Sequence, residues 1–220
     1  MLSLGLLGKG ISHSKSPEMY RKIYNCEIDY HFFDYEIESS IPNLETIFKT
    51  VSGLSITAPY KKHFLGDVKL AEDIIPLNAI NCIAYRSGDF YGTNTDYLAL
   101  AEIFESNEYD KKNIILLGSG SMAHITECYL NSKNINFKNY NRKNDGDLSQ
   151  LDFSDDNLLV INACGRSFDY RGRINSSTVF WDYNYSHEFH LESLQGRCEY
   201  IDGADLLYRQ AVHATKFWNF

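Results

Sequence analysis

The sequence has few of the features that mark secreted, membrane or nucleic-acid-binding proteins. It contains no apolar run near the ~20 residues that a membrane-spanning helix needs, and its start lacks the basic segment of a signal peptide. Its 21 basic residues are outnumbered by 29 acidic ones, which gives a net charge of −8. Because phosphate neutralisation needs a surplus of Lys and Arg, this balance argues against nucleic acids and anionic membranes as partners.

Cysteine and proline are also scarce. The 5 cysteines are scattered without a C-x-x-C pair, and only 4 prolines interrupt the chain. Such spacing is typical of reduced thiols in a cytoplasmic protein, and it predicts neither a disulfide framework nor a metal site. The 220 residues suffice for one large domain or two small ones.

Short apolar runs alternate with amphipathic stretches, as in α/β proteins. In the first half we expect strands at 2–8, 30–37 and 53–57, helices at 16–25 and 41–50, and a hairpin at 80–91. The second half contains the fully apolar run 113–117, typical of a central parallel strand. Around it we expect strands at 136–140, 158–161 and 179–181 and helices at 98–105, 121–131 and 204–220. Two lobes are expected to join near residues 96–102.

A glycine-rich turn follows the apolar run, with the sequence Gly118-Ser119-Gly120-Ser121-Met122-Ala123. In a strand–turn–helix context, this G-x-G-x-x-A pattern indicates a dinucleotide site, because the glycines let a pyrophosphate approach the backbone at a helix N-terminus. A glycine-rich turn without a ligand is the alternative.

The next strand ends at Asn141-Arg142-Lys143, where an NAD site would place an acidic residue for the ribose hydroxyl. A guanidinium beside an ammonium suits a 2′-phosphate instead. The sequence therefore favours NADP over NAD, with a solvated basic turn as the alternative.

Clusters of small polar residues mark the first lobe. Ser14 and Ser16 precede a helix, where hydroxyls and backbone N–H groups suit a carboxylate. Thr57 and Lys61 follow a strand, and Asp96 stands just before the nucleotide lobe.

In their order along the chain, these segments resemble the shikimate dehydrogenase family. The motifs that carry the resemblance run from about residue 4 to residue 218: SHSKSP, SITAPYK, NAIN, NTD, GSGSMA, NRK, INA, DYNY and GADLLYRQ. The resemblance implies an α/β fold, with an N-terminal substrate lobe, a Rossmann-type nucleotide-binding lobe and a C-terminal helix that returns to the first lobe.

The resemblance also implies a role for each matching residue. Lys61 and Asp96 form the catalytic pair. The substrate is bound by Ser14, Ser16, Thr57, Asn81, Tyr185 and Gln210. NADP is bound by Gly118, Ser119, Gly120, Ser121, Met122, Asn141, Arg142, Lys143, Ala163, Tyr183 and Gly203. The substrate-binding catalytic domain would comprise residues 1–97 with 204–220, and the NADP-binding domain residues 98–203. The protein would be a cytoplasmic monomer or homodimer.

Three departures from the family pattern leave the function open. Ser55 stands where the family usually has an Asn that binds a substrate hydroxyl, Asp205 replaces a glycine, and residues 143–157 are too few for the usual helix–strand–helix passage, so the nucleotide lobe is expected to be trimmed. The implied function is NADP-dependent reduction of 3-dehydroshikimate to shikimate in aromatic amino-acid (chorismate) biosynthesis. A paralogue acting on quinate or another ring hydroxy acid, or a non-catalytic NADP- or metabolite-binding homologue, are the alternatives.

Overall fold

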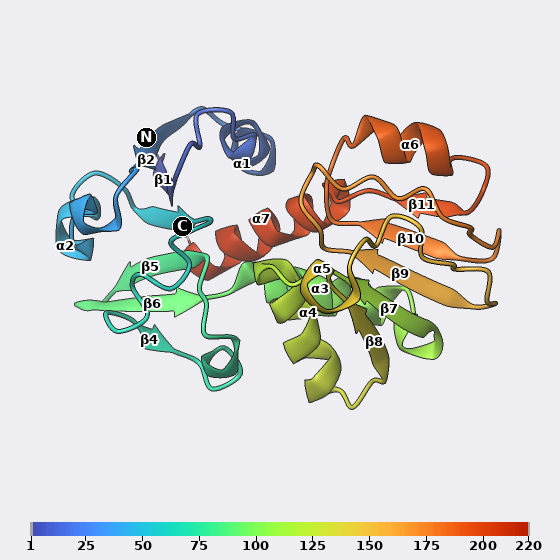
Figure 1. Ribbon diagram of the computed structural model, residues 1–220. Helices are drawn as coiled ribbons and strands as arrows, with labels where there is room; N and C mark the ends of the chain where they lie inside the picture. Colours follow the sequence, from blue (N-terminus) through green and yellow to red (C-terminus); the bar gives the residue numbers. More distant parts are fainter. Residues whose placement is uncertain (1, 220) are drawn as a thin grey trace. The chain divides into compact units, whose positions relative to one another are not determined.

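The computed structural model describes residues 2–219. The chain forms two compact units: one runs to Leu98 and resumes at Tyr208, and the other spans Ala99–Leu207. Each unit contains its own β-sheet with helices packed on it (Figure 1). The α/β fold class predicted from the sequence is therefore confirmed.

The first unit is built on a mixed six-stranded sheet in the order β2-β1-β3-β5-β6-β4. β1 pairs in parallel with β2 and β3, whereas β5 pairs antiparallel with β3 and β6 and forms the expected hairpin. The elements are β1 (Leu2–Gly8), α1 (Ser16–Tyr24), β2 (Ile28–Asp34), α2 (Leu44–Ile47), β3 (Gly53–Ile56), β4 (Lys69–Leu70), β5 (Cys82–Arg86) and β6 (Asp89–Thr93), with 3₁₀ turns at Glu38–Ser40 and Ile75–Leu77.

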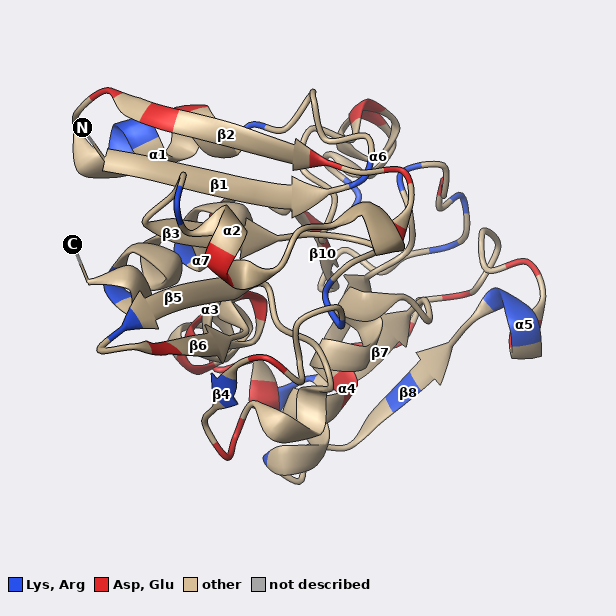
Figure 2. Cartoon of the chain, turned by 90° about the vertical axis from the view of Figure 1, so that its left-hand side faces the viewer, with Lys and Arg blue, Asp and Glu red and all other residues tan. Residues whose placement is uncertain are grey.

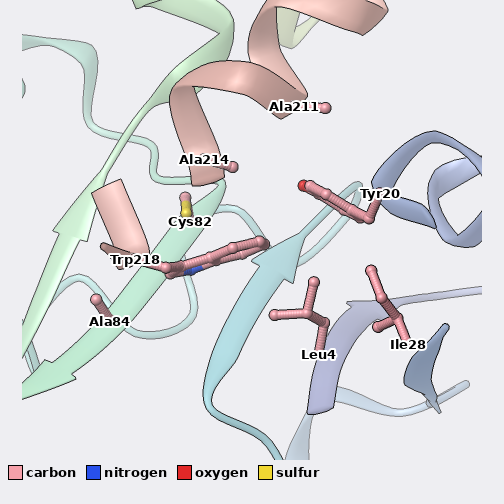
Figure 3. Packing of buried hydrophobic residues seen from close by; sticks show 8 residues of the cluster. All are labelled: Leu4, Tyr20, Ile28, Cys82, Ala84, Ala211, Ala214 and Trp218. Carbon is pink, nitrogen blue, oxygen red and sulfur yellow. The ribbon is translucent and has the colours of Figure 1, made fainter. Parts of the chain in front are cut away.

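The C-terminal helix α7 (Ala204–Trp218) completes the core of this unit. Figure 3 shows Ala211, Ala214 and Trp218 beside Tyr20 of α1 and the strand residues of the same cluster. The Trp218 indole also donates a hydrogen bond to the backbone oxygen of Ile83, at 2.9 Å. The helix therefore returns to the first lobe, as expected.

One helix is shorter than the sequence prediction. The helix expected at 41–50 is limited to α2, because Asn43 caps its start by accepting from the Thr46 N–H and the chain leaves the helix at Phe48. In α1, Ser16 is the first helical residue, and the N-cap position falls on Lys15, whose side chain makes no capping hydrogen bond. The Ser16 hydroxyl is therefore not used as a helix cap.

The second unit contains a parallel five-stranded sheet in the Rossmann-like order β11-β10-β9-β7-β8. Phe104 of α3 contacts Tyr129 of α4 and Trp181 of β10, so these two helices cover one face of the sheet. The elements are α3 (Thr95–Ser106), β7 (Asn113–Leu117), α4 (Ser121–Ser132), β8 (Phe137–Tyr140), α5 (Arg142–Asp145), β9 (Leu158–Asn162), β10 (Val179–Asp182), α6 (Glu188–Leu194) and β11 (Glu199–Ile201), with a 3₁₀ turn at Tyr109–Lys111.

The opposite face of this sheet is covered mainly by irregular chain. Only the four-residue α5 lies between β8 and β9, and no helix lies between β9 and β10. The two connections meet at a bridge between Phe153 and Ile174. Phe153 stacks on Tyr170 at 4.9 Å between ring centroids, and both are buried against the sheet with Phe180. Aromatic side chains thus do the packing that crossover helices do in a longer lobe, and the lobe is trimmed as expected.

A buried polar network ties these connections to the sheet. The Asp182 carboxylate and the His190 ring have fully buried side chains, and Oδ2 lies 2.5 Å from Nδ1. His190 Nε2 accepts from the Tyr170 N–H at 2.8 Å. Because Nε2 is an acceptor, the ring proton lies on Nδ1 and is donated to Asp182. The other carboxylate oxygen accepts from Asn162 and Asn184.

Replacing His190 with Ala should therefore destabilise the protein. The change removes a donor from the buried Asp182 carboxylate and the acceptor of the Tyr170 N–H, so we expect the free energy of unfolding to fall by about 2–4 kcal/mol. Urea denaturation of the full chain measures this. His124→Ala, at an exposed position on α4, is the control, with a change below about 0.5 kcal/mol. Equal effects of the two substitutions would contradict the structural role of His190.

Candidate active site

Lys61 and Asp96 form an ion pair in the first unit. Lys61 follows β3, and Asp96 lies in the first turn of α3. The ammonium nitrogen is 2.7 Å from Oδ2, and both side chains are only 14% exposed. The partial positive charge at the start of α3 also favours the carboxylate. An ammonium held in this way can donate a proton to a ligand while the carboxylate compensates its charge.

Asn81 and Gln210 come together around Thr95, the residue before Asp96. Asn81, only 6% exposed, accepts from the Thr95 N–H at 2.7 Å and from its hydroxyl at 3.2 Å. Gln210 Oε1 is 3.3 Å from the same hydroxyl. Asn94 reinforces the junction by donating to the Ala79 carbonyl. These bonds fix the first turn of α3, and with it the position of Asp96.

The other predicted substrate-binding residues of the first unit lie in the segments that follow β1 and β3. Ser14 and Ser16 bond to each other through their hydroxyls at 3.1 Å, at the start of α1. Thr57 follows β3, and its backbone N–H donates to the Leu7 carbonyl at 2.8 Å. Gly8 is needed here, because a Cβ would lie 2.6 Å from the Thr57 methyl group. The structure thus brings most of the predicted substrate-binding residues into one unit.

Tyr185, the other predicted substrate-binding residue, belongs to the second unit. The Arg166 guanidinium lies over its ring, 4.5 Å from the centroid. This cation–π contact holds a positive charge beside the tyrosine.

A pocket of about 530 Å³ lies in the second unit at the glycine-rich turn. Gly118 has a φ of +118°, and a Cβ on it would meet the Ala163 carbonyl oxygen at 2.9 Å, so glycine is required by conformation and by space. Gly120, the N-cap of α4, has no neighbouring atom within 4 Å of its Cβ position. The turn therefore leaves room for a ligand at the start of α4, as a dinucleotide phosphate requires.

The pocket includes some of the predicted cofactor-binding residues and several that the sequence did not indicate. The predicted ones are Gly118, Ser119, Gly120, Arg142 and Ala163. The others are Asp147, Leu148, Ser149, Cys164, Gly165, Ser167, Phe168 and Asp169. These lie in the two irregular connections, where no pattern of hydrophobic periodicity was available to place them.

The other predicted cofactor-binding residues have different surroundings. Asn141 caps α5 by accepting from the Asn144 N–H, and the basic residues of α5 follow the end of β8 (Figure 2). Lys143 is exposed. Ser121 and Met122 begin α4.

Tyr183 and Gly203 lie beside each other. The Tyr183 hydroxyl pairs with Thr126 of α4 at 2.9 Å, and burial raises its pKa. A Cβ on Gly203 would lie 2.2 Å from the Tyr183 carbonyl oxygen, so the close approach of the two segments depends on this glycine. Both residues thus have a structural role that is independent of a ligand.

The pocket residues carry charges of both signs. Arg142 is accompanied by Asp147 and Asp169. Two hydrogen bonds from Ser149 lower the pKa of Asp147.

Across residues 2–219, no group of three or more His, Cys, Asp or Glu side chains is arranged to hold a metal ion. No helix in the described part of the chain has the length and apolar character needed to cross a membrane.

A Rossmann-like unit with an open glycine turn, combined with a unit that holds a shielded Lys–Asp pair, defines a class of two-domain oxidoreductases. Residues 6–83 match the family model described as "Shikimate dehydrogenase substrate binding domain". The chain is 26% identical over 253 residues to "Shikimate dehydrogenase (NADP(+))" of Clostridium botulinum, which covers 99% of this chain and 96% of that protein. The chain belongs to the shikimate dehydrogenase family.

Solved structures share the fold over the whole chain. Shikimate 5-dehydrogenase from Thermus thermophilus, in complex with NADP(H) and shikimate, gives a TM-score of 0.76 at 17% identity and covers 100% of this chain and 94% of its own. An Ael1 enzyme from Pseudomonas putida gives a TM-score of 0.69 at 17% identity, with 100% and 93% covered. The fold is thus shared by proteins with different names, and it does not by itself decide the substrate.

Proposed function

We propose that the protein is an NADP-dependent dehydrogenase that reversibly reduces 3-dehydroshikimate to shikimate. The observation that carries this proposal is the Lys61–Asp96 pair, with 2.7 Å between charged atoms that are both shielded from solvent. A non-catalytic binding protein has little use for such a pair, because two charges are withdrawn from water at a cost in desolvation. The order of the family's motifs along the chain supports the same reaction.

We assign one of the two ligands to each unit. The first unit, with the predicted bounds 1–97 and 204–220, would bind the ring acid, and residues 98–203 would bind NADP. Ser14 and Ser16 suit the carboxylate, because hydroxyls and N–H groups converge at the start of α1. Asn81, Gln210 and Thr57 suit the ring hydroxyls. The resemblance also assigns Tyr185, in the second unit, to the carboxylate side.

The glycine turn and Arg142 suit the phosphates of NADP. The open space at Gly120 fits a pyrophosphate at the start of α4. The Arg142 guanidinium fits the 2′-phosphate that distinguishes NADP from NAD. When bound, the nicotinamide supplies the hydride for the carbonyl carbon.

Lys61 would act at the carbonyl oxygen. Its ammonium donates a hydrogen bond to the oxygen, stabilises the developing negative charge, and transfers the proton as the alcohol forms. Asp96 holds the ammonium in position and stabilises its positive charge. In the reverse direction the amine accepts the proton from the substrate hydroxyl.

Quinate or another ring hydroxy acid is the second candidate substrate, and Ser55 favours it, because this side chain differs from the family's usual Asn. A spectrophotometric assay of NADPH oxidation with 3-dehydroshikimate, run beside NADP reduction with shikimate and with quinate, tests both. Turnover with quinate alone would replace the first proposal by the second, and no turnover with any of the three would overturn both.

Lys61→Ala should nearly abolish turnover, with kcat lowered by about 10²–10⁴-fold and substrate affinity within about tenfold. Asp96→Asn should also lower kcat, and in addition weaken substrate binding. Steady-state kinetics and substrate titration measure the two effects. The adjacent Lys62 is exposed, so Lys62→Ala is a matched control that should keep kcat. A Lys61→Ala variant with the kcat of the wild type would refute the catalytic assignment.

Arg142→Ala should change the choice of cofactor. Removing a charge-assisted hydrogen bond to the 2′-phosphate should raise KM for NADP by about 10- to 100-fold and leave KM for NAD nearly unchanged. The control is Lys138→Ala, an exposed basic position earlier on β8, which should alter neither KM. Equal weakening of both cofactors by Arg142→Ala would show that the basic turn does not bind the 2′-phosphate.

A further inference from the structure

Ser55 is bonded to a side chain that the sequence did not connect with it. It lies on β3, between Leu6 of β1 and Cys82 of β5. Its hydroxyl is 3.2 Å from the hydroxyl of Tyr20 on α1. Ser55 is half-buried and Thr57 follows two residues later on the same face, whereas the intervening Ile56 is buried. Ser55 thus faces the same side as a predicted substrate-binding residue.

Tyr20 is held rigidly by its surroundings. It is 1% exposed, and its ring lies 5.3 Å from that of Trp218 (Figure 3). The Tyr30 ring is 6.0 Å from it. Burial raises the pKa of its phenol well above the usual range, so the hydroxyl keeps its proton. A buried tyrosine hydroxyl usually has a hydrogen-bond partner, and here Ser55 is that partner.

The direction of this bond follows from chemistry. The geometry allows either hydroxyl to donate. A phenol is more acidic than a serine hydroxyl and is the better donor, so donation from the Tyr20 O–H to Ser55 Oγ is the favoured direction. Ser55 then keeps its own proton, which it can donate to a ligand, and its oxygen is fixed in place by a rigid neighbour. Donation by Tyr20 also makes Ser55 a stronger donor, because hydrogen bonds in a chain polarise one another.

We propose that Tyr20 is a specificity-determining residue, which positions Ser55 to donate a hydrogen bond to a ring hydroxyl of the substrate. The Tyr20–Ser55 pair thereby does the work of the longer Asn that is usual in the family. Tyr20 acts through Ser55 and is a positioning residue, not a catalytic one. This inference rests on the proposed function, because it requires a ring hydroxy acid as the ligand.

The test is Tyr20→Phe, which removes one oxygen and keeps the aromatic packing. We expect KM for the ring acid to rise by about 3- to 10-fold, as for the loss of one neutral hydrogen bond, with kcat and KM for NADP within about twofold. Tyr24→Phe is the matched control: Tyr24 lies on the same helix, packs on the same cluster, and its buried hydroxyl has no hydrogen-bond partner among the described residues. It should leave KM unchanged.

Two further variants separate positioning from mere packing. Ser55→Ala should raise KM about as much as Tyr20→Phe, and the double variant should raise it no further, because both changes remove the same contact. Tyr20→Phe/Ser55→Asn should recover the KM of the wild type, because the amide carries its own donors. If Tyr20→Phe fails to fold, as judged by circular dichroism and thermal unfolding, the KM of Ser55→Ala is the test. A raised KM then supports the role of Ser55 in binding, and an unchanged KM overturns the inference.

Direct titration with shikimate and with quinate distinguishes failure of this inference from failure of the proposed function. A wild-type protein that neither binds nor turns over any ring acid would overturn both. Binding and turnover by the wild type, with the KM and Kd of Tyr20→Phe equal to those of Tyr24→Phe, would overturn the inference alone. Additive effects of Tyr20→Phe and Ser55→Ala would likewise overturn the coupling of the two residues.

Discussion

Two opposite charges withdrawn from water hold the site of the first unit together. The Lys61 ammonium and the Asp96 carboxylate are 2.7 Å apart, and each side chain is 14% exposed. Removing either partner would leave the other poorly solvated, so the surrounding chain must fix both. Asn81 and Gln210 do this for Asp96 through Thr95, and the backbone of Lys61 is bonded to Ile80. The strand ends and the helix start around the pair are arranged by this requirement.

The second unit meets a different constraint, which is to cover a parallel sheet with too little chain for the usual helices. Aromatic rings such as Phe153 and Tyr170 supply apolar area, and the buried Asp182–His190 pair supplies partners for backbone groups that a helix would have satisfied internally. The same irregular connections line the pocket at the glycine turn. The packing of the sheet and the shape of this pocket therefore depend on the same two connections.

The sequence predicted best where one local rule dominates. The apolar run NIILL became β7 with the expected bounds, because a short, continuous apolar run suits a parallel strand that is covered on both faces. The glycine turn was predicted for a similar reason, since the positive φ of Gly118 requires glycine. The sequence did not predict the segments whose conformation is set by contacts with distant parts of the chain. The short helices α5 and α6 lack a strong periodic pattern. The pocket residues of the two irregular connections are held by long-range contacts, such as the bond from the Asn184 amide to the Cys164 carbonyl and the bond from the Arg171 N–H to the Ser149 carbonyl. The bond between Ser55 and Tyr20 joins residues far apart in sequence, so no spacing could indicate it.

Within the candidate site of the first unit, the proposed chemistry and the choice of substrate depend on different kinds of contact. In the proposed reaction, proton transfer would depend on Lys61 and Asp96, which any ring ketone could use. The choice among ring acids would depend on a few neutral hydrogen bonds worth about 1 kcal/mol each. One such bond changes discrimination by only about fivefold, so a serine in place of an asparagine can shift the preferred substrate without touching the chemistry. A rigid partner such as Tyr20 lowers the entropic cost of ordering the shorter side chain. Under the proposed function, substrate choice would therefore depend on how the donors of the first unit are held, more than on which donors are present.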